Sequence, residues 1–231
     1  MIYNGKNLKD FHVQFMDESA FIAVPARSYT TTTVEGRNGD LHFDNGRWEN
    51  LSVKSNCIIV DDIRRYYGEL AAFLTQDSSY HRLEGFKEPD YYRLAAVKSV
   101  GTPKLRSFAR GGLFQITWDC KPLRYLKSGE EAVTFTKSGA LLSQWYVPAK
   151  PLLRVYGWGT VKVGTGAFEI FSDAPEWIDI DCDIKDAYSG GDNRNSFLSV
   201  SEWPTLTEGL NEITIPATVS KIVVTPRWVT L

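Results

Sequence analysis

The three histidines of the chain are the first residues to examine for chemistry, because an imidazole serves as a metal ligand and as a general base near neutral pH. They are His12, His42 and His81, and no two of them have the spacing of a zinc motif or stand beside a cysteine. The sequence also contains no G-x-S-x-G nucleophile elbow and no P-loop. We therefore predict that the protein is not an enzyme and has no catalytic residue, no metal site and no cofactor.

The three cysteines, Cys57, Cys120 and Cys182, are widely separated and are flanked by apolar residues typical of strands. This pattern favours buried free thiols over a disulfide framework. Buried free thiols suit a protein that is made and folded in a reducing cytoplasm.

Aspartates recur at alternate positions in WIDIDCDI, residues 177–184. The alternation predicts a half-buried antiparallel strand with its aspartates on a solvated face. The residues expected toward the core are Ile178, Ile180, Cys182 and Ile184. A calcium site needs its oxygens on one loop, whereas carboxylates spread along a strand diverge from a single ion. A loop site that recruits Asp186 or Asp192 is the alternative.

Two glycine pairs bracket a short TVKV run, with Gly157 and Gly159 before it and Gly164 and Gly166 after it. Neither pair leads into a helix, so no phosphate-binding loop is expected. The pattern indicates strands joined by tight turns, that is, a β-hairpin.

Aromatic residues crowd the second half of the chain. In a β-sandwich most of them are expected in the core, but an exposed ring on such a fold can stack on a sugar. The candidate glycan-stacking residues are Trp145, Tyr146, Trp158 and Tyr188.

Composition narrows the function classes further. The 231 residues include 26 Lys and Arg against 28 Asp and Glu, for a net charge of −2, and 43% are hydrophobic. The hydrophobic share argues against a disordered chain. With a net charge close to zero, the protein lacks the positive electrostatic field of a dedicated nucleic-acid binder. No stretch approaches the roughly 18 apolar residues of a membrane helix, and the N-terminus lacks the pattern of a signal peptide. We expect a soluble protein with no sequence-specific nucleic-acid binding and no membrane association.

Most of the chain has the pattern of short β-strands, rich in β-branched and aromatic residues and bounded by Gly, Pro, Asn or Asp. Strands are expected at 56–60, 91–97, 113–119, 152–158, 167–171, 177–184, 211–215 and 221–225. One segment, 61–76, has helical spacing, and Asp61 or Asp62 is expected to cap its N-terminus. The side chains on its apolar side are Ile63, Tyr66, Tyr67, Leu70, Phe73 and Leu74.

A polar stretch, KSGEEAVTFTKSG, and the two prolines of VPAKP mark a change of character between residues 127 and 151. After it come short strands separated by turn signals, the spacing typical of a β-sandwich. We predict an N-terminal domain at 1–135 and a C-terminal sandwich domain at 136–231, and leave open whether the last strand packs back on the first domain.

Four stretches stand in a distinctive order. They are VEGRNGDL (34–41), DDIRRYYGELAAFL (61–74), the pair EPDYYRLAAV (88–97) and GGLFQITWDCKPLRY (111–125), and the stretch from DCDIKDAYSGG to TPRW (181–228). In order and spacing they resemble the distal tail protein (Dit) family of long-tailed phages that infect Gram-positive bacteria. The resemblance covers nearly the whole chain, although each stretch is weak alone.

The resemblance implies a mainly β fold, with an N-terminal ring-forming β domain that carries one α-helix and a C-terminal galectin-like β-sandwich. It implies a hexameric ring at the phage tail tip, a virion component made in the host cytoplasm. The implied partners are the tail tube protein on one face, the tail-associated baseplate protein on the other, and receptor-binding proteins. DNA would pass through the ring without being gripped.

Ring contacts favour aromatic and arginine side chains. The candidate subunit-interface residues are Tyr29, Arg37, Asn38, Tyr66 and Tyr67. An ordinary hairpin and an ordinary core helix explain the same residues equally well. The alternative function is a monomeric lectin-like module acting directly on the host cell wall, and a hydrolase with an unrecognised site is a third class.

Overall fold

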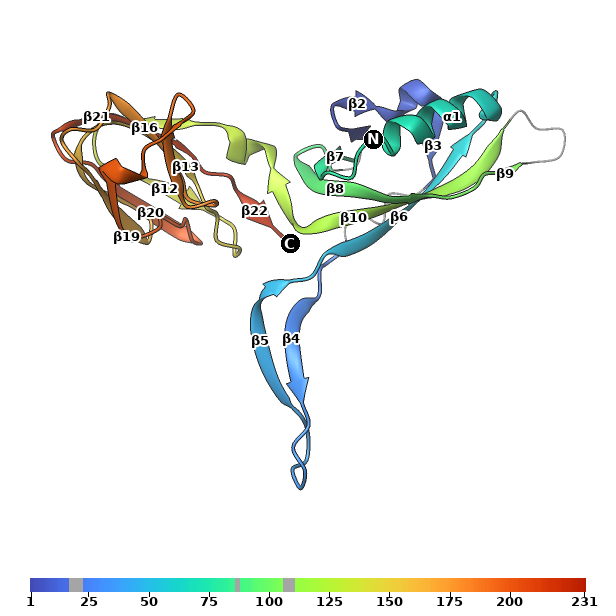
Figure 1. Ribbon diagram of the computed structural model, residues 1–231, viewed down its shortest axis with the longest axis horizontal. Coiled ribbons are helices and arrows are strands. Elements are labelled where there is room, and N and C mark those ends of the chain that lie inside the picture. Colours follow the sequence, from blue (N-terminus) through green and yellow to red (C-terminus); the bar gives the residue numbers. More distant parts are fainter. Residues whose placement is uncertain (17–22, 86–87, 106–110) are drawn as a thin grey trace. The chain divides into compact units, whose positions relative to one another are not determined.

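A computed structural model describes residues 1–16, 23–85, 88–105 and 111–231. The chain divides into two compact units, the first comprising residues 1–124 with Leu231 and the second residues 125–230. Strands predominate in both units, as the sequence predicted (Figure 1). The one α-helix among the described residues lies in the first unit.

The first unit is built on an antiparallel sheet with long central and short outer strands, in the order β2-β1-β7-β8-β10-β6-β3. Along the central strands β6 and β10, alternate side chains are buried on one face and exposed or half-buried on the other. This alternation is that of a sheet with one covered face. The strands are β1 (Ile2–Tyr3), β2 (Lys6–Asn7), β3 (Val13–Phe15), β6 (Leu51–Ile59), β7 (His81–Glu84), β8 (Tyr91–Val100), β9 (Lys104–Leu105), which pairs with β10, and β10 (Gly112–Leu126).

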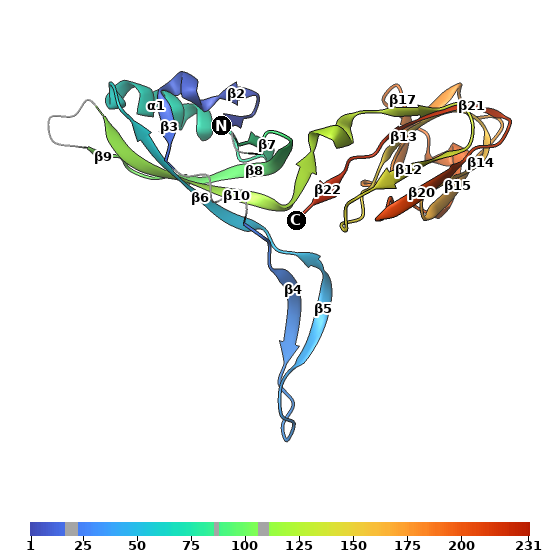
Figure 2. The ribbon, with the colours of Figure 1, turned by 180° about the vertical axis from the view of Figure 1, so that it is seen from behind.

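Helix α1 (Ile63–Leu74) covers one face of this sheet, as both views show (Figures 1 and 2). Its helical spacing is confirmed, because Leu70 and Leu74 are buried in the core and the aromatic side chains of the same side pack against it. The expected capping by Asp62 is wrong. Asp62 occupies the N-cap position with a left-handed φ of 36°, and its side chain makes no capping hydrogen bond. A capping side chain normally starts from an extended backbone, which directs its oxygen toward the first turn.

Strands β4 (Arg27–Thr32) and β5 (Leu41–Trp48) form a two-stranded sheet of their own. Their antiparallel pairing runs along the whole ribbon, with one register shift near its base. Figure 1 shows this ribbon extending from the sheet of the first unit. We call residues 27–48 the arm hairpin.

The second unit consists of two antiparallel sheets that face each other (Figure 1). Apolar side chains from both sheets are buried. One sheet contains β11 (Val133–Phe135), β21 (Val219–Thr225), β13 (Leu152–Gly157), β16 (Trp177–Asp181), β17 (Asp186–Ser189) and β18 (Asp192–Asn193), in that order. The other contains β12 (Gly139–Ser143), β20 (Gly209–Thr214), β14 (Gly159–Val163), β15 (Gly166–Ile170) and β19 (Leu198–Glu202). The remaining elements are the short strand β22 (Val229–Thr230) and the 3-10 turns at Leu8–Phe11, Lys127–Glu130 and Asn195–Phe197.

The WIDIDCDI segment differs from its prediction. Strand β16 ends at Asp181, and Ile184 is 64% exposed rather than buried. Asp179 and Asp181 are each only 6% exposed, so the solvated acidic face is wrong. Two arginines distant in sequence, Arg154 and Arg227, pair with these carboxylates. The Asp181 carboxylate also accepts backbone N–H groups of the following turn, which ends the strand.

Two other expectations are confirmed. The glycine pairs flank β14 and β15, which form the predicted hairpin. Gly164 has a φ of 56°, and an added Cβ would collide with the carbonyl oxygen of Thr205, so the turn requires glycine there. Cys57, Cys120 and Cys182 are buried free thiols. Burial raises the pKa of Cys120 and of Cys182 to about 12.

Candidate assembly surfaces

The arm hairpin exposes both of its faces. Ser28 is buried at its base, but the other side chains of β4 and nearly all of those of β5 are exposed. An isolated two-stranded hairpin is marginally stable in water, because it has no third strand or helix against which to bury a face. The ribbon is therefore a surface that lacks a packing partner within the described part of the first unit.

A polar cluster lies at the base of the arm hairpin. Arg27 binds Asp44 through two N–H groups, with Nη2 to Oδ2 at 2.6 Å and Nε to Oδ1 at 3.0 Å, and its guanidinium lies 4.7 Å from the ring centre of Trp48. The hydrogen bonds from Arg27 hold the pKa of Asp44 below its usual range. The two side chains are 43% and 56% exposed, and ion pairs this exposed contribute little to stability.

The arm hairpin also carries three of the five predicted interface residues. Tyr29 on β4 is 55% exposed and stacks on His42 of β5, with ring centres 4.9 Å apart. Phe43, which the sequence reasoning did not single out, is 56% exposed on β5. Arg37 and Asn38 lie in the exposed loop at the tip. The ribbon thus presents aromatic rings along its length and an amide and a guanidinium at its end.

A hydrogen-bonded cluster near the base of the arm hairpin could not be found from the sequence. The amide of Asn50 donates to the hydroxyl of Tyr80 at 2.8 Å and to the carboxylate of Asp119 at 3.2 Å. Tyr80 in turn donates to Asp119 at 2.5 Å, and this bond raises the pKa of the phenol. Because the three residues lie 30 to 69 positions apart, no local pattern could have found them. The cluster ties the chain just after β5 to β10.

Tyr66 and Tyr67, the other two predicted interface residues, have partners inside the first unit. Tyr66 stacks on His12 with ring centres 3.9 Å apart. Tyr67 packs edge-on against Phe114 and donates its hydroxyl hydrogen to the carbonyl oxygen of Gly101 at 3.1 Å. Both rings are half-buried, so they join the helix to the sheet and expose only part of their surface.

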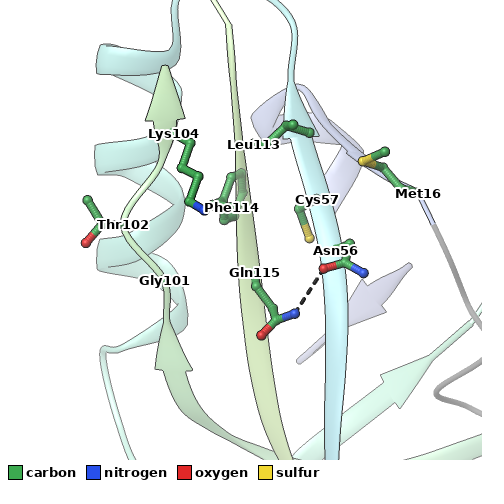
Figure 3. A pocket seen from close by; sticks show the side chains of 9 residues that line it. All are labelled: Met16, Asn56, Cys57, Gly101, Thr102, Lys104, Leu113, Phe114 and Gln115. Atoms are coloured by element: carbon green, nitrogen blue, oxygen red, sulfur yellow. Dashed lines mark hydrogen bonds between the residues drawn. The ribbon is translucent and has the colours of Figure 1, made fainter. Parts of the chain in front are cut away.

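A groove of about 660 Å³ lies over the face of the sheet that α1 leaves open (Figure 3). Gln115 and Asn56 lie at its floor and are joined by an amide hydrogen bond of 3.0 Å. Its other exposed or half-buried lining side chains are Met16, Thr102, Lys104 and Leu113. Among the described lining residues there is no carboxylate or imidazole, so the groove offers surface for contact and no acid–base pair for catalysis.

The four glycan-stacking candidates stand on different elements of the second unit. Trp145 and Tyr146 follow β12, and Tyr146 is 84% exposed. Trp158 joins β13 to β14 and is 47% exposed. Tyr188 is half-buried on β17, in the opposite sheet to β12. The structure therefore offers several separate aromatic positions.

The described residues contain neither a metal-binding cluster nor a membrane-spanning helix. No group of three or more histidine, cysteine, aspartate or glutamate side chains is arranged to hold a metal ion within residues 1–16, 23–85, 88–105 and 111–231. In those same residues, no helix is long and apolar enough to cross a membrane.

No protein-family model and no curated protein matches this sequence. Among solved structures, the chain is similar to the Dit protein (gp 19.1) of phage SPP1, whose structure is described as a paradigm of the hub adsorption apparatus in phages that infect Gram-positive bacteria. The TM-score is 0.76, the match covers 96% of each chain, and 14% of the residues are identical. The chain has the fold of a phage Dit protein. The resemblance seen in the sequence is thereby confirmed at the level of the fold.

The Dit fold accounts for the mainly β architecture with one helix in the first unit. Because the match extends over nearly the full length of both chains, it includes both compact units. At 14% identity the fold is retained while most side chains differ. The surface contacts of this chain therefore depend on its own residues.

Proposed function

We propose that this protein is the structural hub of a phage tail tip, a virion component without enzymatic activity. The main support for this proposal is that a chain with the Dit fold carries an arm hairpin with both faces exposed. A ribbon that exposes both faces, with aromatic side chains along it, needs a partner surface to be ordered. A hub built from copies of one chain supplies such a surface on each neighbouring copy.

The assembly we propose is a hexameric ring in which each subunit makes heterologous contacts with two neighbours. A heterologous interface joins two different surfaces and forms a closed ring when its rotation closes. The arm hairpin, with Tyr29, Arg37 and Asn38, provides one surface. The open sheet face with its groove provides a second surface in the same unit.

The open sheet face also suits the wall of a channel through which DNA passes. Along β6 and β10 its polar side chains are mostly neutral, and the charged ones are two lysines, Lys54 and Lys121, and one aspartate, Asp119. A protein grips the DNA backbone by neutralising phosphates with several basic groups. A nearly uncharged face does not do so. In this proposal the ring binds the tail tube protein on one side and a baseplate protein on the other, and it supports receptor-binding proteins.

Light scattering on a size-exclusion column, followed by negative-stain imaging, tests this proposal. We expect rings of six copies of the 26.1 kDa chain. The double variant Tyr29→Ala/Phe43→Ala should lower the ring fraction, whereas the control Ile184→Ala, which alters an exposed side chain of the second unit, should leave it unchanged. Antibody labelling of purified phage particles provides a second readout at the tail tip. A chain that stays monomeric and is absent from tail tips would overturn the proposal.

The alternative is a lectin-like module that binds the host cell wall directly. The exposed rings of Tyr146 and Trp158 favour it. A monomer that binds purified cell walls, and loses this binding in the Tyr146→Ala/Trp158→Ala variant, would favour the alternative over the hub.

A further inference from the structure

The outer face of the sheet that contains β13 and β16 carries two adjacent rows of polar and aromatic side chains. Directly paired residues project to the same side of a sheet. In the first row Tyr156 of β13 is paired with Trp177 of β16 and with Lys221 of β21. In the second row Asp179 is paired with both Arg154 and Tyr188. We call the six residues Lys221, Tyr156, Trp177, Arg154, Asp179 and Tyr188 the aromatic–arginine face.

An ion pair fixes the centre of this face. Arg154 binds Asp179 through Nε to Oδ1 at 2.7 Å and Nη2 to Oδ2 at 2.8 Å. The aspartate side chain is 8% exposed, whereas that of the arginine is 44% exposed. Binding through two parallel N–H groups sets the plane of a guanidinium as well as its position. The face therefore presents a charged, oriented hydrogen-bond donor to solvent.

Aromatic rings frame the ion pair. The Arg154 guanidinium lies 4.3 Å from the ring centre of Trp177, and the ammonium of Lys221 lies 4.2 Å from that of Tyr156. Tyr188 is half-buried on the far side of Asp179. Within the described residues, neither the indole N–H of Trp177 nor the hydroxyl of Tyr188 has a hydrogen-bond partner. Both groups remain able to bind a ligand.

A sugar matches this combination of groups. A pyranose ring has apolar C–H faces, which suit flat aromatic rings, and a rim of hydroxyls, each of which donates and accepts hydrogen bonds. The aromatic rings of this site suit the C–H faces of the sugar. Its guanidinium, ammonium, indole N–H and phenol groups can hydrogen-bond to the sugar hydroxyls. The face spans four neighbouring strands, β21, β13, β16 and β17, and is therefore roughly 14 Å across, which is the scale of a short oligosaccharide.

The other sheet of this unit has a different surface. There Leu142 of β12 and Leu210 of β20 are paired and are 64% and 69% exposed. Exposed aliphatic side chains of this kind suit the apolar centre of a protein interface. The aromatic–arginine face has rings and charges instead, so a glycan fits it better than a protein does.

We propose that the aromatic–arginine face is a carbohydrate-binding site, through which the second unit contacts the glycans of a cell surface. The site goes beyond the hub function and does not depend on ring formation. It also differs from the exposed positions Tyr146 and Trp158, and of the rings considered from the sequence only Tyr188 belongs to it.

The test begins with the full chain on an array of defined oligosaccharides, followed by titration to millimolar concentrations while the indole N–H signals are recorded by NMR. The Trp177→Phe variant identifies the Trp177 signal. We expect at least one array glycan to shift that signal. If no oligosaccharide on the array shifts it, the proposal is wrong.

Variants locate the binding. Tyr188→Ala and Trp177→Ala should weaken the affinity for the array glycan by about tenfold or more, as loss of an aromatic contact does at other binding sites. The matched control Tyr146→Ala, which removes an exposed ring from the segment that follows β12, should bind as the parent chain does. The reverse pattern would overturn the proposal. Light scattering on the same variants separates the two functions, because a change of ring mass with no change in glycan affinity would identify the face as a subunit contact.

Discussion

The part of the molecule that the structure describes contains the same three-residue arrangement in two different settings. At the base of the arm hairpin Arg27 binds Asp44 through two N–H groups and lies over Trp48. In the second unit Arg154 binds Asp179 in the same way and lies over Trp177. The guanidinium-to-ring distances are 4.7 Å and 4.3 Å, so the two arrangements have nearly equal geometry.

The two arrangements differ in the exposure of the carboxylate. The side chain of Asp44 is 56% exposed, whereas that of Asp179 is 8% exposed. A buried carboxylate depends on its arginine, because it has lost most of its water. An exposed carboxylate exchanges its arginine for water at almost no cost. The Arg154–Asp179 pair therefore stabilises the sandwich. The Arg27–Asp44 pair adds little stability to the arm hairpin, whose side chains can rearrange when they contact a partner.

The largest expected effect is that of Arg154→Ala. It leaves the Asp179 carboxylate buried and unpaired, so the free energy of unfolding of the second unit should fall by about 3 kcal/mol. Asp179→Ala should cost less, because the remaining arginine is 44% exposed and can be hydrated. Urea denaturation followed by tryptophan fluorescence measures both variants. Equal losses for the two variants would show that the aspartate does not depend on the ion pair more than the arginine does.

A smaller effect concerns pH. Burial raises the pKa of Asp181, but the hydrogen bonds from Arg227 and from the backbone N–H of Asp183 outweigh it, so the net pKa lies below its usual range. A carboxyl with a depressed pKa stabilises the fold above its unfolded pKa of about 3.9, and this contribution is lost as the pH falls through the lower folded value. The stability of the second unit should therefore decline below about pH 4.

The variant Asp181→Asn isolates that contribution. It should be less stable than the parent chain at neutral pH, and the difference should shrink as the medium becomes acidic. The control is Asp183→Asn, whose side chain is 60% exposed and pairs with Lys150. Its stability profile should run parallel to that of the parent chain. A difference between the parent chain and Asp181→Asn that does not change with pH would contradict the assignment.

Local patterns sufficed for features that depend on neighbours in sequence. The helix followed from the spacing of Ile63, Leu70 and Leu74, and the β14–β15 hairpin from its glycines. The order of short motifs along the chain was sufficient to suggest the Dit fold, which the structural match confirms. Such features are encoded by periodicity and turn chemistry.

Features that depend on distant partners could not be predicted in this way. The alternation around Asp179 indicated a solvated face, because nothing local reveals that Arg154, 25 positions away, buries the carboxylate. The Asn50–Tyr80–Asp119 cluster could not be predicted for the same reason, because its members are distant in sequence and meet only in the fold. The predicted interface residues Tyr29, Arg37 and Asn38 share one ribbon, but their role in a ring remains a proposal.

The variant Asn50→Ala tests whether the arm hairpin is anchored at its base. It removes the hydrogen bonds to Tyr80 and Asp119, which are exposed, so the loss in unfolding free energy should be about 0.5 kcal/mol. Amide hydrogen exchange in β4 and β5 should become faster, whereas exchange in β13 and β16 should stay unchanged. Unchanged exchange in the arm hairpin would show that the cluster does not order the ribbon.

The smallest expected effect on the folded monomer is that of Arg27→Ala. It removes the exposed counterpart of Arg154, and its side chain and that of Asp44 are hydrated enough that the unfolding midpoint should not change measurably. The same variant should lower the ring fraction in light scattering if the arm hairpin contacts a neighbouring subunit. Assembly would then bury the Asp44 carboxylate, and without water it would need Arg27 as its partner. A lowered midpoint would mean that the arm hairpin is stabilised within its own subunit. An unchanged midpoint with fewer rings would show that Arg27 stabilises the contact between subunits, whereas Arg154 stabilises the fold of its own subunit.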